Sequence, residues 1–106
     1  MSSFLEKLCK FKKSESEEIK DSELYNLDST ICAFIIPKLK KFKEVTKSYP
    51  PQVGSFENWQ DTIDKMIYWM EMYLDDDNRY NRTEEEKMKM EEGKKLFFDF
   101  FENLWW

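Results

Sequence analysis

The stretch WQDTIDKMIYWMEMYL, residues 59–74, decides the fold. Its apolar residues recur every three or four positions, which is the spacing of one face of an α-helix. They are Trp59, Ile63, Met66, Ile67, Met70, Tyr73 and Leu74. Tyr68, Trp69 and Met72 widen this face until most of the circumference is apolar. Because such a helix packs between other elements, we predict that it is the central helix of a small bundle.

The composition also favours an all-α fold in one domain. The chain has 106 residues, and its two glycines and three prolines are too few turn signals for a many-stranded β fold. Aromatic residues make up 17%, which gives a short chain a large apolar area to bury. No apolar stretch is long enough to span a membrane and no signal peptide is visible, so we expect an intracellular protein.

Several kinds of catalytic site lack a required member. There is no histidine, which removes Ser-His-Asp and Cys-His catalysis and the usual zinc sites. The two glycines are isolated, so no phosphate-binding loop is present. Cys9 and Cys32 are expected to stay reduced in an intracellular protein. We therefore expect a protein without enzymatic activity and without a cofactor.

The net charge of −5 is unevenly distributed. Residues 1–50 carry ten basic and eight acidic side chains (+2), whereas residues 51–106 carry seven basic and fourteen acidic ones (−7). At the N-terminus, residues 1–13 combine apolar and lysine side chains as an amphipathic helix does, and a polar linker follows over residues 14–21. We predict an N-terminal amphipathic helix or flexible tail over residues 1–22 and a helical bundle domain over residues 23–106. The N-terminal segment could pack as a terminal helix, or meet a membrane surface or a partner.

The second helix is predicted to begin near Asp28, as N-cap, and to continue to about Thr46. Pro37 falls inside this pattern, so we expect either a kink or two abutting helices. Five lysines cluster beyond it: Lys38, Lys40, Lys41, Lys43 and Lys47. This basic patch could bind phosphate, as in a nucleotide or nucleic acid, or an acidic partner. Alternatively it is the solvated face of the helix.

The prolines of residues 48–54 end that helix, and Ser55 is the expected N-cap of the central one. Three acids, Asp75, Asp76 and Asp77, oppose the dipole of the central helix at its C-terminus, so this helix should stop at or before them. Thr83 and Glu86 form a capping-box pattern for the last helix. Its apolar stripe comprises Met88, Leu96, Phe97, Phe100, Phe101 and Leu104, with Phe98, Trp105 and Trp106 outside it. Gly93 predicts the close approach of a neighbouring helix over Trp59 or Trp69.

Four segments together resemble a family of small uncharacterised bacteriophage proteins. They are LDSTICAFIIPKLKKFKE (27–44), YP (49–50), WQDTIDKMIYWME (59–71) and EGKKLFFDFFENLWW (92–106), about two-thirds of the chain. The resemblance implies a phage origin and the host cytoplasm as the place of action. It implies no activity, and it transfers no site residues.

Three kinds of site remain open. An acidic surface could imitate the phosphates that a basic host protein binds, and its residues would be Asp75, Asp76, Asp77, Glu84, Glu85 and Glu86. Trp105 and Trp106 either fold back onto the bundle or anchor a partner, which includes a second copy of the chain. Asp64 and Glu71 lie seven residues apart on one face of the central helix, as a carboxylate-metal enzyme would need. We expect a phage accessory protein that binds a macromolecule, possible targets being a host or a defence protein.

Overall fold

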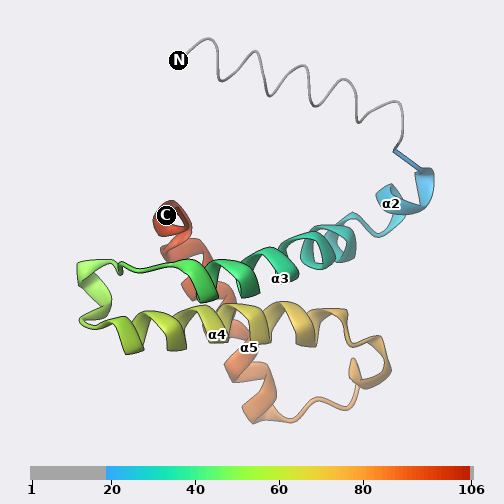
Figure 1. Ribbon diagram of the computed structural model, residues 1–106. Coiled ribbons are helices and arrows are strands. Elements are labelled where there is room, and N and C mark those ends of the chain that lie inside the picture. Colours follow the sequence, from blue (N-terminus) through green and yellow to red (C-terminus); the bar gives the residue numbers. More distant parts are fainter. Residues whose placement is uncertain (1–18, 106) are drawn as a thin grey trace. The chain divides into compact units, whose positions relative to one another are not determined.

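The computed structural model describes residues 19–105, and every regular element in this range is helical (Figure 1). The predicted all-α fold is therefore confirmed. The elements are α2 (Asp21–Tyr25), α3 (Leu27–Val45), α4 (Phe56–Leu74) and α5 (Glu84–Asp99), with three short 3₁₀ helices, η1 (Pro51–Val53), η2 (Asp76–Asn78) and η3 (Phe101–Asn103). Most of the predicted N-terminal segment, residues 1–18, lies outside the described residues.

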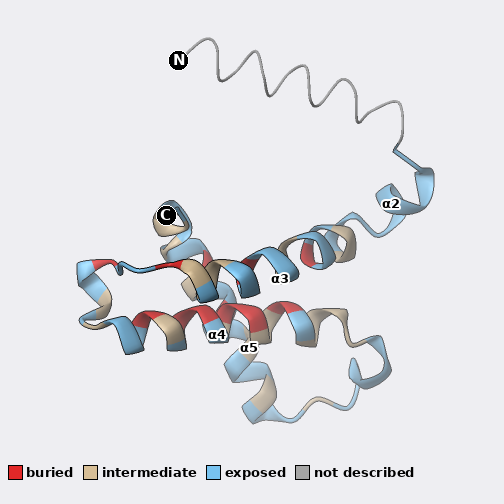
Figure 2. Cartoon of the chain, viewed as in Figure 1, coloured by how far each residue is buried: buried red, intermediate tan, exposed pale blue. Residues whose placement is uncertain are grey.

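The chain divides into two compact units, one ending at Thr30 and the other beginning at Ile31. In the first unit, α2 has no buried residue (Figure 2), and the Thr30 hydroxyl donates a hydrogen bond to the carbonyl of Glu23 (3.0 Å). The prediction that α3 starts after Asp28 is wrong. The carbonyl of Asn26 already accepts the first helical hydrogen bond, from the amide of Thr30 (2.9 Å), so Asp28 lies inside the first turn.

In the second unit α4 is the central helix, as predicted. The Ser55 hydroxyl caps it by accepting a hydrogen bond from the amide of Asn58 (3.1 Å), and the helix ends at Leu74, before the three acids. Five residues of the predicted stripe are buried (Figure 2), namely Trp59, Ile63, Met66, Ile67 and Met70, and Tyr73 and Leu74 are partly buried. Thr62, which was not predicted, is buried as well. Both boundaries of α4 and the face that it turns to the core were thus predicted from the sequence.

The part of α3 after Ile31 runs beside α4 in the opposite direction (Figure 1). The helix continues through Pro37, so the alternative of two abutting helices is wrong. Pro37 is exposed, so water can reach the carbonyl group that its ring deprives of a helical donor. The Trp59 ring joins the helices, since it meets Phe42 of α3 (centroids 6.5 Å apart) and Phe100 after α5 (5.7 Å) edge to face.

α5 crosses α4 steeply (Figure 1), and Gly93 lies at the crossing. A Cβ atom added there would clash with the carbonyl oxygen of Lys65 and lie 2.9 Å from Cβ of Trp69. The predicted close approach is confirmed over Trp69. The backbones can touch because glycine has no side chain.

Two members of the predicted α5 stripe lie on the surface instead. Met88 is 71% exposed and Phe101 is 60% exposed, whereas Phe97 is buried. The steep crossing carries the first turns of α5 past α4 (Figure 1), which leaves Met88 without a facing helix. Phe101 departs because α5 ends at Asp99 and the chain continues as a 3₁₀ turn, whose residues point in other directions than an α-helix would give.

We expect Gly93→Ala to lower the free energy of unfolding by about 1–3 kcal/mol, although alanine favours helix by about 1 kcal/mol. The added methyl group meets a backbone carbonyl, which cannot move without shifting a helix. Urea unfolding followed by circular dichroism measures the change. Lys94→Ala, at the exposed neighbouring position, is the matched control and should stay within about 0.5 kcal/mol. A Gly93→Ala variant as stable as the parent would contradict the tight crossing.

Candidate functional site

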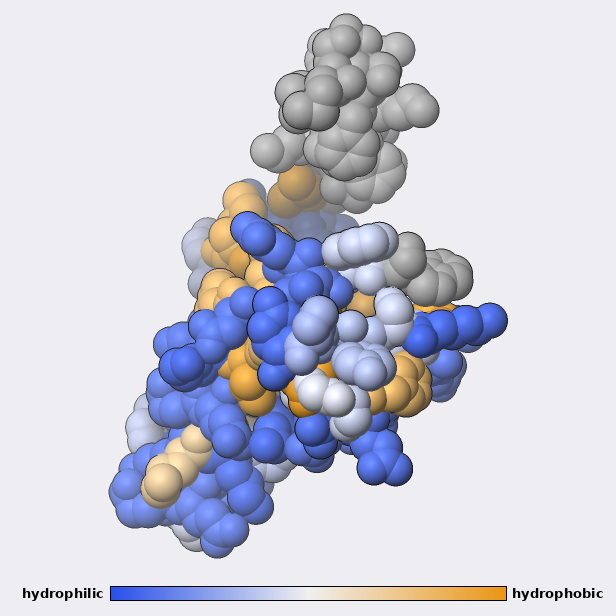
Figure 3. All heavy atoms as spheres, turned by 90° about the vertical axis from the view of Figure 1, so that its left-hand side faces the viewer, coloured by the Kyte–Doolittle hydropathy of each residue, from blue (hydrophilic) through white to orange (hydrophobic). Residues whose placement is uncertain are grey.

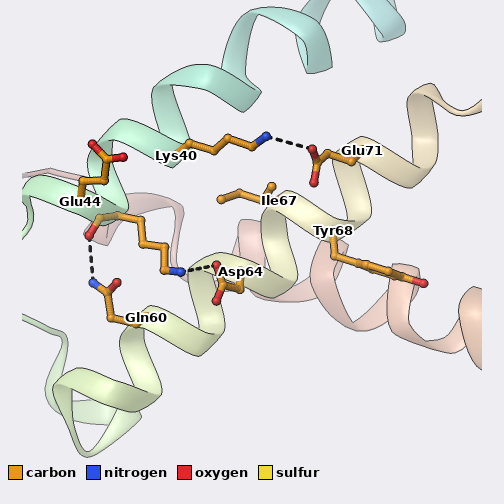
Figure 4. A pocket seen from close by; sticks show the side chains of 8 residues that line it. Lys40, Glu44, Gln60, Asp64, Ile67, Tyr68 and Glu71 are labelled. Atoms are coloured by element: carbon orange, nitrogen blue, oxygen red, sulfur yellow. Dashed lines mark hydrogen bonds and ion pairs between the residues drawn. The ribbon is translucent and has the colours of Figure 1, made fainter.

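An open depression of about 680 Å³ lies between α3 and α4 (Figure 4). Ile67 lies in it, Tyr68 points away from α3, and the other lining residues are polar or charged: Lys40, Lys43, Glu44, Gln60, Asp64 and Glu71. The depression brings together two groups of residues that were considered separately above, the basic patch and the carboxylates of Asp64 and Glu71. Members of the basic patch face the two carboxylates proposed for a metal.

These opposite charges pair with one another across the depression. Lys43 Nζ lies 2.7 Å from Asp64 Oδ1, and Lys40 Nζ lies 3.0 Å from Glu71 Oε2 (Figure 4). The Gln60 side-chain amide also donates to the carbonyl of Lys43 (3.0 Å), which lies in the last turn of α3 and lacks a helical donor. Most of the side chains that line the depression therefore form polar contacts between α3 and α4.

The basic patch is largely compensated within the protein. Besides the two pairs with α4, Lys41 pairs with Glu44 (3.5 Å) and the Lys38 ammonium lies 3.7 Å from the Phe34 ring centroid. Lys47, the fifth member, is exposed. A phosphate ligand would have to compete with these carboxylates, so the arrangement disfavours the nucleotide or nucleic-acid alternative.

The two carboxylates proposed as metal ligands, those of Asp64 and Glu71, take part in the same ion pairs. Asp64 and Glu71 each face a lysine ammonium, which repels a cation. Within residues 19–105, no three acidic or cysteine side chains lie together in a way that could hold a metal ion.

A double-mutant cycle on Lys43→Ala and Asp64→Ala should give a coupling of about 0.2–1 kcal/mol, because both side chains are partly exposed to water. The coupling should shrink at high salt, since ions screen exposed charges. Unfolding of the parent, the two single variants and the double variant in urea measures it. Zero coupling at low salt would show that the pair does not hold α3 to α4. Lys43 would then be available to bind a phosphate group or an acidic partner.

The acidic residues of the proposed phosphate mimic have local structural roles. The amide of Asp75 donates to the carbonyl of Met72 at the end of α4 (3.2 Å), and Asp76 pairs with Arg79 (3.5 Å). In α5, Glu84 and Glu85 lie in the first turn, within 3.4 Å and 3.3 Å of Lys87 and Lys89. Asp76, Asp77, Glu84 and Glu85 are nevertheless exposed.

Glu86 belongs to the predicted capping box, which is confirmed. The amide of Thr83 donates to Glu86 Oε1 (2.9 Å), and the amide of Glu86 donates to the Thr83 hydroxyl (3.1 Å). Sequence reasoning missed Arg82, whose guanidinium donates to the carbonyls of Met72 and Asp75 and so caps α4. The loop holds two arginines, Arg79 and Arg82, and nothing in the sequence indicates which of them caps α4.

We expect Glu86→Ala to lower the free energy of unfolding by about 0.5–1.5 kcal/mol, because the Thr83 amide loses its acceptor. Glu86→Gln keeps an acceptor oxygen and should lose clearly less. Thermal and urea unfolding of both variants measure the difference. Equal losses would mean that Glu86 stabilises α5 through its negative charge in the first turn and not through the hydrogen bond to the Thr83 amide.

Four rings that contact one another in a chain are here called the aromatic cluster: Trp69, Phe97, Phe98 and Phe101. The Phe97 ring lies 5.7 Å from Trp69, 5.4 Å from Phe98 and 5.8 Å from Phe101, measured between centroids. Phe97 is buried, whereas Phe98 and Phe101 are 62% and 60% exposed. The cluster thus has a fixed base in the core and two rings in solvent.

Trp105 is the other exposed aromatic residue at this end of the chain. It is 74% exposed and lines a separate cavity of about 180 Å³ together with Tyr49, Pro50 and Trp59. The expected fold-back of at least one C-terminal tryptophan is not visible for Trp105, which remains mostly in solvent. Trp106 lies outside the described residues.

Exposed apolar side chains do not form one continuous field on the face shown in Figure 3. Hydrophobic residues there form separate groups among hydrophilic ones. Individual exposed hydrophobic residues are common on protein surfaces, so a candidate site needs neighbouring exposed rings on a rigid base. The aromatic cluster meets this requirement.

Comparison with protein-family models, curated proteins and solved structures gives no match. Among the helices of residues 19–105, none combines the length and apolar character needed to cross a membrane. The geometry of the aromatic cluster is therefore the basis for the function proposed below.

Proposed function

We propose that the protein acts without catalysis, by binding a macromolecular partner through the aromatic cluster. The observation that carries this proposal is the exposure of Phe98 and Phe101 on top of the buried Phe97. Rigid aromatic side chains in this position are typical of the residues that dominate protein interfaces.

A partner could bury the parts of the Phe98 and Phe101 rings that the fold leaves in water. Removing apolar surface from water contributes about 25 cal/mol per Å², or about 1.5–3 kcal/mol for a phenylalanine that becomes fully buried. Their base is already ordered by contacts with Phe97 and, for Phe98, with Trp69 (6.2 Å). Binding therefore requires little loss of side-chain freedom.

The resemblance to bacteriophage proteins supports the biological setting of the proposal. In that setting the protein is a phage accessory protein in the host cytoplasm, and its partner is a host protein or a defence protein that it inhibits. Trp105, which is 74% exposed, is a second aromatic residue available to a partner.

The acidic phosphate mimic is a second candidate. Its support is that four of its six carboxylates, those of Asp76, Asp77, Glu84 and Glu85, are exposed. Its weakness is that Asp75 and Glu86 belong to helix ends and that three of the exposed acids pair with neighbouring basic side chains.

The test is affinity purification of the tagged full-length protein from expressing bacterial cells, with mass spectrometry of co-eluting proteins. We expect a stoichiometric partner that is lost with the Phe98→Ser, Phe101→Ser double variant. The matched control is Tyr80→Ser with Met88→Ser, which removes two apolar side chains that are 92% and 71% exposed elsewhere. Circular dichroism must show that both variants fold.

A third variant separates the two candidates: Asp75→Asn, Asp76→Asn and Asp77→Asn together. A partner that survives the loss of Phe98 and Phe101 but not this neutralisation would replace the aromatic cluster by the acidic mimic. Recovery of the same partner by every variant would reject both surfaces.

A further inference from the structure

Phe98 separates two depressions on the surface of α5 and η3. One, of about 500 Å³, is lined by Phe98 with four charged residues that precede it, Glu91, Glu92, Lys94 and Lys95. The other, of about 640 Å³, is lined by Phe98, Asp99, Phe101 and Glu102. The Phe98 side chain therefore lies between two open depressions, here called the two hollows.

The spacing of the two hollows suits a helix. Their lining residues are centred on positions 94 and 100, six positions apart along α5 and η3, which corresponds to roughly 9–10 Å along the helix axis. Side chains at positions i and i+7 of a partner helix are separated by about the same distance. A helix lying along α5 could thus place one apolar side chain in each hollow, on both sides of the Phe98 ring.

The charges around the hollows are mostly negative. Four carboxylates line them, those of Glu91, Glu92, Asp99 and Glu102, against the two ammonium groups of Lys94 and Lys95. Two of the carboxylates are paired within the protein, that of Asp99 with Lys95 (2.9 Å) and that of Glu92 with Lys65 (3.5 Å), which leaves Glu91 and Glu102 against Lys94. The surrounding region has the same sign, because residues 51–106 carry seven basic and fourteen acidic side chains. Charge complementarity calls for a positively charged partner.

A second copy of the chain fits this surface less well. A symmetric dimer through α5 would bring the same carboxylates against each other. A head-to-tail contact through α3 would have to break the pairs of Lys40, Lys41 and Lys43 with Glu71, Glu44 and Asp64. The lysine-bearing segment of residues 1–13 in a second copy is the alternative occupant, and the ultracentrifugation measurement below tests it.

We propose that the aromatic cluster and its two hollows receive a basic amphipathic helix of another protein, with its apolar face on Phe98 and Phe101 and its lysine or arginine side chains beside the flanking carboxylates. This inference rests on the proposed function and specifies the chemistry of the partner. A neutral or acidic partner bound through Phe98 would leave the proposed function standing and overturn this inference alone.

The experiment uses the full-length protein and two fluorescein-labelled synthetic helical peptides of about 18 residues, a length that can form a helix. Both have leucine at i, i+3, i+4 and i+7 positions, and their other positions are lysine in one and glutamate in the other. Fluorescence anisotropy measures the dissociation constants at low and high salt. We expect the lysine peptide to bind at least about tenfold more tightly than the glutamate peptide, and to weaken as salt rises.

Variants assign the binding to this surface. Phe98→Ser should weaken the lysine peptide by about tenfold or more, and the Glu91→Gln, Glu102→Gln double variant should weaken it several-fold and flatten its salt dependence. Tyr80→Ser, at a 92% exposed position before the start of α5, should change nothing. The inference is overturned if the lysine peptide does not bind, if the glutamate peptide binds equally well, or if Phe98→Ser has no effect. A dimer in analytical ultracentrifugation that Phe98→Ser abolishes would assign the surface to a second copy instead.

Discussion

The backbone contact between α4 and α5 at Gly93 fixes the rest of the folded unit. Since a Cβ atom at this position would clash with the Lys65 carbonyl, the crossing exists only because residue 93 is glycine. The contact determines how α5 is rotated. It sends Phe97 into the core beside Trp69 and leaves Phe98 on the surface.

α3 is joined to α4 in a different way, through a layer of side chains. The Trp59–Phe42 ring contact and the ion pairs of Lys40 and Lys43 span this second interface. Because these lysines neutralise carboxylates of α4, the positive charge of α3 is compensated internally. Beside the exposed aromatic rings of α5 and η3, Glu92 and Asp99 are likewise paired with lysines, and Glu91 and Glu102 supply the remaining negative charge.

Local signals in the sequence were sufficient for the elements of the fold, whereas the site depends on how those elements cross. Ser55, the stripe of α4 and the Thr83–Glu86 capping box could all be predicted because each depends on residues within a few turns. Gly93 even indicated the crossing. The angle of this crossing was not predictable, and neither was the change to a 3₁₀ turn after Asp99, so Met88 and Phe101 were both assigned to the apolar stripe of the last helix. The ion pairs of Asp64 and Glu71 were also missed, since the pairing partners come from another helix.

The sequence FFDFF of residues 97–101 gives a further reason to regard the aromatic cluster as functional. Successive residues of an α-helix point about 100° apart, so a single neighbouring helix cannot bury both members of an adjacent pair. With Phe97 buried and Phe100 packed against the core, Phe98 faces outwards, and the 3₁₀ turn after Asp99 directs Phe101 outwards as well. Both rings still contact Phe97, and Phe98 also contacts Trp69, so each contributes to the fold through its buried edge. More than half of each ring remains in water, and covering that area is the gain that a binding partner would supply.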